Sequence, residues 1–109
     1  MTESLPATAV VRVSRGTFDP DRFTEVDAAN KKTSEYLVPA ISALPGLLDY
    51  HVGISAQAGS IVHISIWDTD EHAARMSRLT EMTVVAAGEM TAVGVTFAPI
   101  VNYPISWTI

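Results

Sequence analysis

The fold of this chain is decided by residues Leu44 to Met76, which read LPGLLDYHVGISAQAGSIVHISIWDTDEHAARM. Apolar side chains alternate with polar or small ones over residues 47–55 and again over residues 61–67, as in strands that have two different faces. The loop between them, residues 56–60, is built of small or polar residues and contains one glycine, which predicts an antiparallel hairpin. Asp68 then stands at a helix-capping position, with Glu71 three residues later as in a capping box.

The predicted hairpin has one apolar face and one mixed face. If Ser55 lies opposite Ile61, then His51 and His63 become diagonal neighbours on the mixed face. The strand predicted over residues 7–14 contributes two further side chains to it. In full, the mixed face holds Val10, Arg12, His51, Ile61, His63, Ser65 and Trp67. We expect the helices to pack against the opposite, apolar face.

Caps and breakers define the other elements. A helix is predicted from Pro20 to Leu44, because Asp19 can cap it and Pro45-Gly46 stops it, and Pro39 predicts a kink or a break near its end. Further elements are expected at residues 69–77 and 81–93 as helices, and at residues 95–101 and 102–109 as strands. This order is the split βαβ arrangement of a ferredoxin-like α+β protomer with an antiparallel sheet. We expect a single domain over residues 1–109, with residues 1–6 as a loose tail.

A homodimer is expected because the mixed face is too apolar for water. Two protomers joined sheet face to sheet face would form a dimeric α+β barrel. The C-terminal residues 102–109 place four large apolar side chains on one face, and Trp107 is the largest of them. A free terminal strand of this kind invites aggregation. We therefore expect it to pack on the partner subunit, with Trp107 as the anchor.

Composition excludes several classes of function. The net charge of -5 and the absence of any Lys/Arg run argue against nucleic acid or an anionic membrane surface as a partner. No apolar run approaches the ~20 residues of a membrane helix. The chain contains no cysteine, and its first residues do not resemble a signal peptide. We therefore expect a cytoplasmic protein.

The same stretch resembles a known family. Pro45-Gly46-Leu47, the strand that ends at Trp67 and the sequence DTDEHA of residues 68–73 are similar to the pattern of the antibiotic biosynthesis monooxygenase family, in the dimeric α+β barrel superfamily. The resemblance extends over about residues 10–101. It implies a ferredoxin-like protomer whose sheet joins that of a second copy. Members include cofactor-independent oxygenases of aromatic polyketides and haem-degrading enzymes.

The resemblance does not extend to the haem-degrading members. Those proteins carry an Asn on the first strand and a His in the helix after the Trp. This chain has Val11 and Arg12 on the first strand, and residues 75–77 (Arg-Met-Ser) stand where the haem histidine is expected. His72 lies closer to the start of that helix and would face in a different direction. We therefore expect no haem and no other bound cofactor. A metal is not expected either, because two histidines and Asp49 make a thin ligand set.

Three residues are candidates for chemistry. His51 and His63 are predicted to form a proton-transfer pair, since histidine titrates near neutral pH, and Arg12 to hold an anionic oxygen of a substrate. Two alternatives remain open: the histidines fill a dimer interface, and Arg12 forms an ion pair with Asp49 or with the partner subunit.

Four residues are candidates for binding. Trp67 is expected either to stack on a flat substrate or to pack at the strand end, and Ser65, Ile61 and Val10 would line the same cavity. The first hypothesis for function is cofactor-independent oxygenation of an aromatic or polyketide-like substrate. The alternative is a non-catalytic dimeric barrel that holds a small apolar ligand or serves in assembly.

Overall fold

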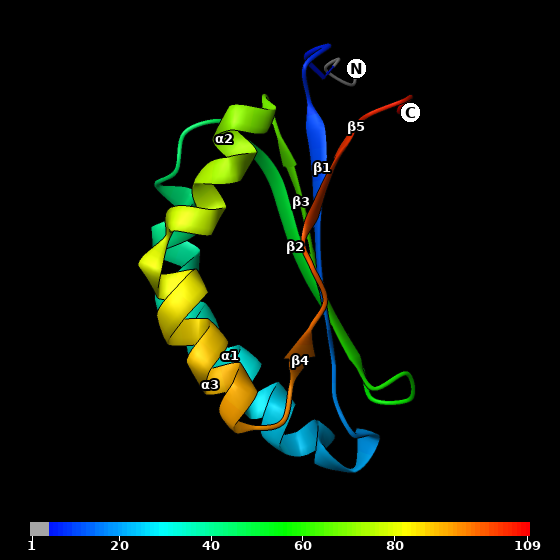
Figure 1. Cartoon of the computed structure of the whole chain (residues 1–109), viewed down its shortest axis with the longest axis vertical. Coiled ribbons are helices and arrows are strands. Elements are labelled where there is room, and N and C mark those ends of the chain that lie inside the picture. Colours follow the sequence, from blue (N-terminus) through cyan, green and yellow to red (C-terminus); the bar gives the residue numbers. More distant parts are fainter. Residues whose placement is uncertain (1–4) are drawn as a thin grey trace.

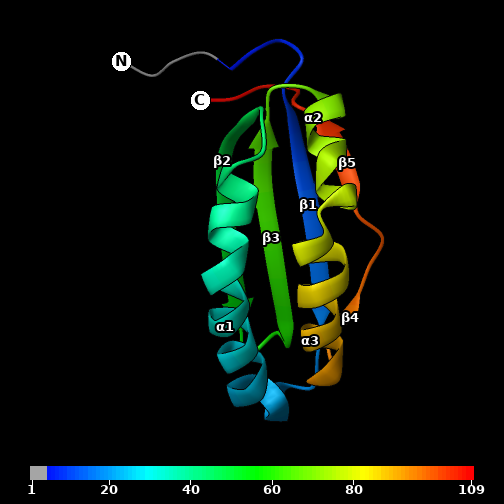
Figure 2. The same ribbon diagram turned by 90° about the vertical axis from the view of Figure 1, so that its left-hand side faces the viewer.

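The computed structural model describes residues 5–109, so residues 1–4 of the expected tail lie outside the described residues. The described chain forms two layers, a sheet and a layer of helices that covers one of its faces (Figure 1). The opposite face of the sheet carries no helix (Figure 1). The two ends of the described part of the chain lie at the same end of the molecule (Figure 2).

The sheet confirms the ferredoxin-like prediction. Its strands are β1 (Val10–Thr17), β2 (Leu47–Ser55), β3 (Ser60–Trp67), β4 (Thr96–Phe97) and β5 (Val101–Pro104). The order is β2-β3-β1-β4, all neighbours are antiparallel, and β5 also pairs with β1. The two short strands, β4 and β5, lie along the same edge of β1 (Figure 2). They are separate strands because the segment between them contains Pro99, which has no backbone N–H to donate.

The helices begin and end close to their predicted positions. A short 3₁₀ turn, η1 (Pro20–Arg22), leads into α1 (Phe23–Ser42), and the Asp19 side chain accepts from the Asp21 amide at its start. The break predicted at Pro39 was wrong, because α1 continues through this residue to Ser42. The remaining helical elements are α2 (Asp70–Ala74), the 3₁₀ turn η2 (Arg75–Arg78), the π-helical segment η3 (Glu81–Ala86) and α3 (Ala87–Ala92).

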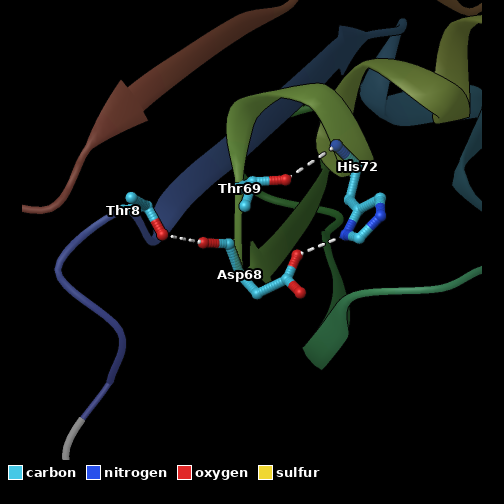
Figure 3. A network of polar contacts seen from close by, with 4 residues as sticks. All are labelled: Thr8, Asp68, Thr69 and His72. Atoms are coloured by element: carbon cyan, nitrogen blue, oxygen red, sulfur yellow. Dashed lines mark hydrogen bonds and ion pairs between the residues drawn. The ribbon is translucent and has the colours of Figure 1, made fainter.

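A polar network joins the hairpin to α2 (Figure 3). The Thr69 hydroxyl caps α2 by accepting from the His72 amide at 3.1 Å, so the cap is one residue later than predicted. Asp68 instead pairs with His72 Nδ1 at 2.6 Å, and its carbonyl accepts from the Thr8 hydroxyl. Gly46 has φ +83°, and a Cβ at this position would overlap the Asp68 and His72 side chains. The Pro45-Gly46 turn is therefore needed for the close approach of this network.

The hairpin register differs from the predicted one by one residue on β3. Ser55 pairs with Ser60 rather than Ile61, because the connecting loop has four residues, 56–59, rather than five. A shift of one residue moves every side chain of a strand to the other face relative to its neighbour. Tyr50 therefore lies opposite Ser65, and His51 lies opposite Ile64. The predicted diagonal pair of His51 and His63 was wrong.

The two faces of the sheet are also exchanged relative to the prediction. The helices cover the mixed face, where Val10, Arg12, Ile61, Ser65 and Trp67 are all buried. The apolar face carries no helix, and Ile64 on it is 39% exposed. This exchange is possible because the polar side chains of the mixed face lie around a cavity rather than in solid packing. The apolar face thus remains uncovered in the single chain.

The C-terminal segment is only partly as predicted. Residues 101–104 form β5 on this chain's own β1, and the Ile105 amide donates to the Ala9 carbonyl. β4 pairs only with Gly16 and Thr17, so the same edge of β1 over residues 10–13 can accept β5. This pairing does not decide whether residues 102–109 also pack on a partner subunit. Residues 106–109 continue past the sheet, and Trp107 is 77% exposed in the single chain. For these residues, contact with a partner stays a prediction.

Candidate active site

The register of the sheet divides its covered face into four rows. The outer rows are apolar, with Val10, Trp67 and Leu47 at one end and Gly16, Ile61 and Ile54 at the other. The two central rows contain Arg12, Ser65 and Tyr50, followed by Ser14, His63 and Val52. The outer rows belong to two separate hydrophobic clusters. A polar belt therefore crosses the covered face between two apolar cores.

A cavity of about 290 Å³ lies between this belt and the helices. Its polar wall comes from β1, β2 and β3, whereas its apolar wall comes mainly from α1, η2, η3 and α3. The apolar wall includes Leu37, Met76, Met82 and Met90. Methionine is flexible and polarisable, so such a wall adapts to flat ligands. The wider π-helical turn of η3 borders the same space, and segments of this kind are frequent at functional sites.

The central feature of the polar wall is a pair formed by Tyr50 and His63. Tyr50 Oη lies 2.7 Å from His63 Nδ1, and the two rings meet edge to face. Burial lowers the pKa of His63 to about 4, and burial raises the pKa of Tyr50, with the charge of Arg12 opposing the second shift. Both side chains are therefore uncharged near neutral pH, and one proton is shared between them.

The pair borders a second hollow as well. This hollow, of about 280 Å³, lies between α1 and β2 and is lined by Val38 and Val52. Tyr50 and His63 line both spaces, as do Thr33 and Leu37. A molecule in either hollow would therefore be in contact with the same proton-sharing pair.

Arg12 brings a positive charge to the cavity. The residue is 6% exposed, and its guanidinium donates to Asn102 Oδ1 and Ser77 Oγ, both at 3.4 Å. Burial lowers the pKa of Arg12 from its ordinary value. Among residues 5–109, no carboxylate oxygen lies within 4.0 Å of it, so the alternative of an ion pair with Asp49 does not apply within this chain. The guanidinium therefore has donors available for a ligand.

Ser65 and Trp67 act as a unit. The indole Nε1 of Trp67 donates to Ser65 Oγ at 2.8 Å, and both residues are buried. Trp67 is 0% exposed within the cluster at the end of the sheet, and it does not line the cavity. Ser65 does line it, and its hydroxyl proton stays available to a ligand because the oxygen serves as the acceptor. Of the two alternatives for Trp67, packing at the strand end describes its position, and stacking on a ligand in this cavity does not.

The other predicted site residues lie away from the cavity. The His51 side chain is 72% exposed on the uncovered face, where Nε2 lies 3.0 Å from Asp49 Oδ2. Ile61 and Val10 are buried in the two hydrophobic clusters and line neither hollow. The structure thus brings Arg12, His63 and Ser65 together, but it does not bring His51 to them.

Sequence reasoning missed Tyr50, which was not among the candidate residues. The correct register would have placed it opposite Ser65 and diagonal to His63. It also missed four polar side chains from the helical elements that line the cavity, namely Asn30, Thr33, Ser77 and Thr83. Asn30 fell in a gap of the apolar helix pattern, and a polar residue on an otherwise buried helix face was the available signal.

In the described part of the chain, no group of three or more His, Asp or Glu side chains is placed to hold a metal ion. Nor does any helix of that part combine the length and apolarity needed to cross a bilayer.

The architecture is that of the ferredoxin-like α+β proteins, and comparison with solved structures agrees. The chain is similar to the cofactor-independent oxygenase SnoaB from Streptomyces nogalater, with a TM-score of 0.66 and 18% identity over 94% of this chain and 98% of SnoaB. It is also similar to a proposed antibiotic biosynthesis monooxygenase from Deinococcus radiodurans, with a TM-score of 0.71 and 19% identity over 92% of this chain and 95% of that one. A third such structure, a proposed monooxygenase from Caulobacter crescentus, has a TM-score of 0.69 and 12% identity over 93% of this chain and 92% of its own.

These similarities confirm the suspected resemblance at the level of fold. Several of the solved structures carry the name of the family that the sequence resembles. No protein-family model matches the chain, and no curated protein sequence matches it. At such low identity the likeness establishes the fold and not the activity.

Proposed function

We propose that this protein is a cofactor-independent oxygenase that oxidises an aromatic or polyketide-like substrate in the cavity between the sheet and the helices. The observation that carries the proposal is the placement of the uncharged Tyr50–His63 pair and the buried Arg12 cation on one wall of one cavity. The similarity to SnoaB gives independent support. Oxygenation without a cofactor requires a base, a group that holds the substrate anion and a space protected from water.

His63 is the proposed base. In the tautomer with its proton on Nδ1, that nitrogen donates to Tyr50 Oη, and Nε2 keeps a lone pair for a substrate proton. The low pKa keeps the ring unprotonated at neutral pH, so the lone pair is available. A substrate anion formed beside the new imidazolium stabilises it, which offsets the low basicity of the resting ring. Tyr50 orients His63 and keeps its own proton for a hydrogen bond to the substrate.

The electron and atom balance needs only the substrate and dioxygen. His63 removes a proton from an activated ring C–H₂ group, which a naphthol has in its keto tautomer, and Arg12 holds the resulting enolate oxygen. The anion transfers one electron to O₂, and the two radicals combine to form a C–O–O⁻ group. This group takes the proton from His63, and loss of the second C–H proton with O–O cleavage leaves a carbonyl and water. One oxygen atom enters the product, and the other leaves as water.

The test is oxygen uptake by the purified protein in chelator-treated buffer with 1-naphthol and with 2-naphthol. We expect uptake above the buffer rate, and His63→Asn should reduce it by about 10²-fold or more, since positioned general bases contribute ~10²–10⁴-fold. The control is His51→Gln, which changes an exposed imidazole on the uncovered face and should leave the rate unchanged. Binding of these compounds without oxygen uptake would contradict the proposal and favour the non-catalytic ligand-binding barrel.

The proposed assembly is a homodimer through the uncovered face of the sheet. This face presents Val11, Val13, Val62, Ile64 and Ile66, and the described monomer offers no helix to cover them. Tyr103 and Val101 from β5 extend the same face, and both are exposed. Burial of such a surface between two copies would join the sheets into a barrel with the helices outside.

A further inference from the structure

Among residues 5–109, no negatively charged side chain lies in direct contact with the buried Arg12 side chain. Its hydrogen bonds among the described residues are two contacts of 3.4 Å to neutral oxygens, those of Asn102 and Ser77. A carboxylate is present only indirectly, because the Asn102 amide nitrogen donates to Asp70 Oδ1 at 3.3 Å. The amide thus separates Asp70 from the guanidinium. Burial of a cation is costly unless a charged or hydrogen-bonded partner compensates for it.

The Arg12 side chain lies on the same face of the sheet as the rest of the site. In the sheet register, Arg12 pairs with Ser65, and His63 pairs with Ser14 one row further along. Arg12 and His63 are therefore diagonal neighbours on one face, with Cα atoms roughly 7–8 Å apart. Tyr50 follows Ser65 in the row of Arg12. One small molecule can contact the guanidinium and the Tyr50–His63 pair at the same time.

The size of the cavity restricts the ligand further. Its volume of about 290 Å³ is at the lower end of ligand pockets, which hold drug-sized molecules at ~300–1,000 Å³. The apolar helical wall, with Leu37 and Met90, suits a flat ring system. One or two fused rings fit such a space better than a larger polycycle. The Arg12 guanidinium adds a planar fork of donors that matches a carboxylate.

We propose that the substrate is an aromatic carboxylic acid of one or two rings that carries its hydroxyl next to the carboxylate. This inference rests on the proposed function only in taking this cavity as the substrate site. The carboxylate pairs with Arg12, and the neighbouring hydroxyl and ring carbon lie at Tyr50 and His63. Because the carboxylate and the hydroxyl stand on neighbouring ring carbons, Arg12 also lies next to the negative charge that develops on the hydroxyl oxygen.

The experiment compares two ligands of equal size by calorimetry near neutral pH, without turnover. The first is a hydroxynaphthoate with carboxylate and hydroxyl on neighbouring carbons, and the second is its neutral carboxamide. For the unmodified protein, we expect the acid to bind about 10- to 100-fold more tightly, as a charge-assisted pair should. Equal affinity for the two ligands would overturn the inference.

Two variants assign the preference to Arg12. Arg12→Gln should remove the preference for the acid and leave the affinity for the carboxamide within about 3-fold, since only the ionic pair is lost. Arg12→Lys keeps the charge without the planar fork and should keep part of the preference, which covers the case that the Gln variant does not fold. The matched control is Arg15→Gln on the same strand, where the exposed guanidinium donates to Ser60 Oγ on the opposite side of the sheet.

The two proposals fail in different ways. Tight, Arg12-dependent binding of the acid without oxygen uptake supports the substrate class and contradicts the oxygenase. Oxygen uptake with neutral naphthols, together with equal affinity for the acid and the carboxamide, supports the oxygenase and contradicts the substrate class. A preference that persists in Arg12→Gln but disappears in Arg15→Gln would also overturn the inference, because a surface charge would then attract the acid.

Discussion

Acidification should destabilise this protein through His63. Burial holds the pKa of His63 at about 4 in the folded chain, against 6.5 for the exposed group. Between these two values the unfolded chain binds a proton that the folded chain does not bind. The stability contributed by the unprotonated ring is therefore fully present above about pH 6.5, and it is lost as the pH falls toward 4.

The size of the effect follows from the shift. The whole window from 6.5 to about 4 corresponds to at most about 3 kcal/mol of unfolding free energy. Between about pH 7 and pH 5 the expected loss is about 2 kcal/mol. For a chain of this length, that is a substantial part of a total stability of ~5–15 kcal/mol.

The assay is urea unfolding, followed by circular dichroism, at a series of pH values across this window. The variant His63→Asn keeps an amide for the Tyr50 hydroxyl but cannot titrate, so it should lose about 2 kcal/mol less than the unmodified protein over the same interval. Carboxylates that titrate in both proteins cancel in this difference. His51→Gln retains His63 and should retain the full loss. An identical pH dependence of His63→Asn and the unmodified protein would refute the reasoning.

Three further predictions concern the fold and the assembly. Gly46→Ala should destabilise the chain by about 2–4 kcal/mol in thermal unfolding, because a Cβ would overlap Asp68 and His72 at a positive φ, whereas Gly88→Ala, with open space around it, should stabilise by about 0.5–1 kcal/mol; equal effects would contradict the role given to the turn. Ile64→Asp should convert the proposed dimer to a monomer in light scattering while the circular dichroism spectrum is retained, and an unchanged mass would exclude this face as the interface. Deletion of residues 106–109 keeps the β5 pairing intact and should weaken the dimer or cause aggregation, whereas an unchanged dissociation constant would show that Trp107 does not contact a partner.

The sequence was sufficient for the elements and their order, because alternation, caps and breakers are local signals. The split βαβ topology followed from that order, and the strand faces of β1 and β3 were assigned correctly. The register of the hairpin did not follow, because residues 56–60 permit a loop of either four or five residues. The face that receives the helices did not follow either. Both faces of β3 are rich in apolar residues, so hydrophobicity alone does not distinguish them.

The candidate site depended on these two undecided points. Arg12, His63 and Ser65 were found because they share strand faces that alternation defines. Tyr50 was missed and His51 was wrongly included, because both assignments change with the register of β2 against β3. The polar side chains that the helices contribute to the cavity could not be predicted for a different reason. Polar residues such as Thr33 and Thr83 are ordinary on a helix surface, and only the tertiary structure shows that they border a cavity.

The exchange of faces has a physical explanation. The covered face of the sheet includes the polar belt of Arg12, Tyr50 and His63, and its desolvation would be expensive if the helices packed directly on it. The helices pack instead on the apolar rows at the two ends, and the belt faces the space that remains between them. The uncovered face is apolar over Val11, Val13, Ile64 and Ile66. Its polar side chains already have partners, as in the Asp49–His51 and Arg15–Ser60 contacts, so a second sheet can cover the apolar part without unpaired donors. The same row pattern therefore explains both the open cavity within one protomer and the surface proposed for its partner.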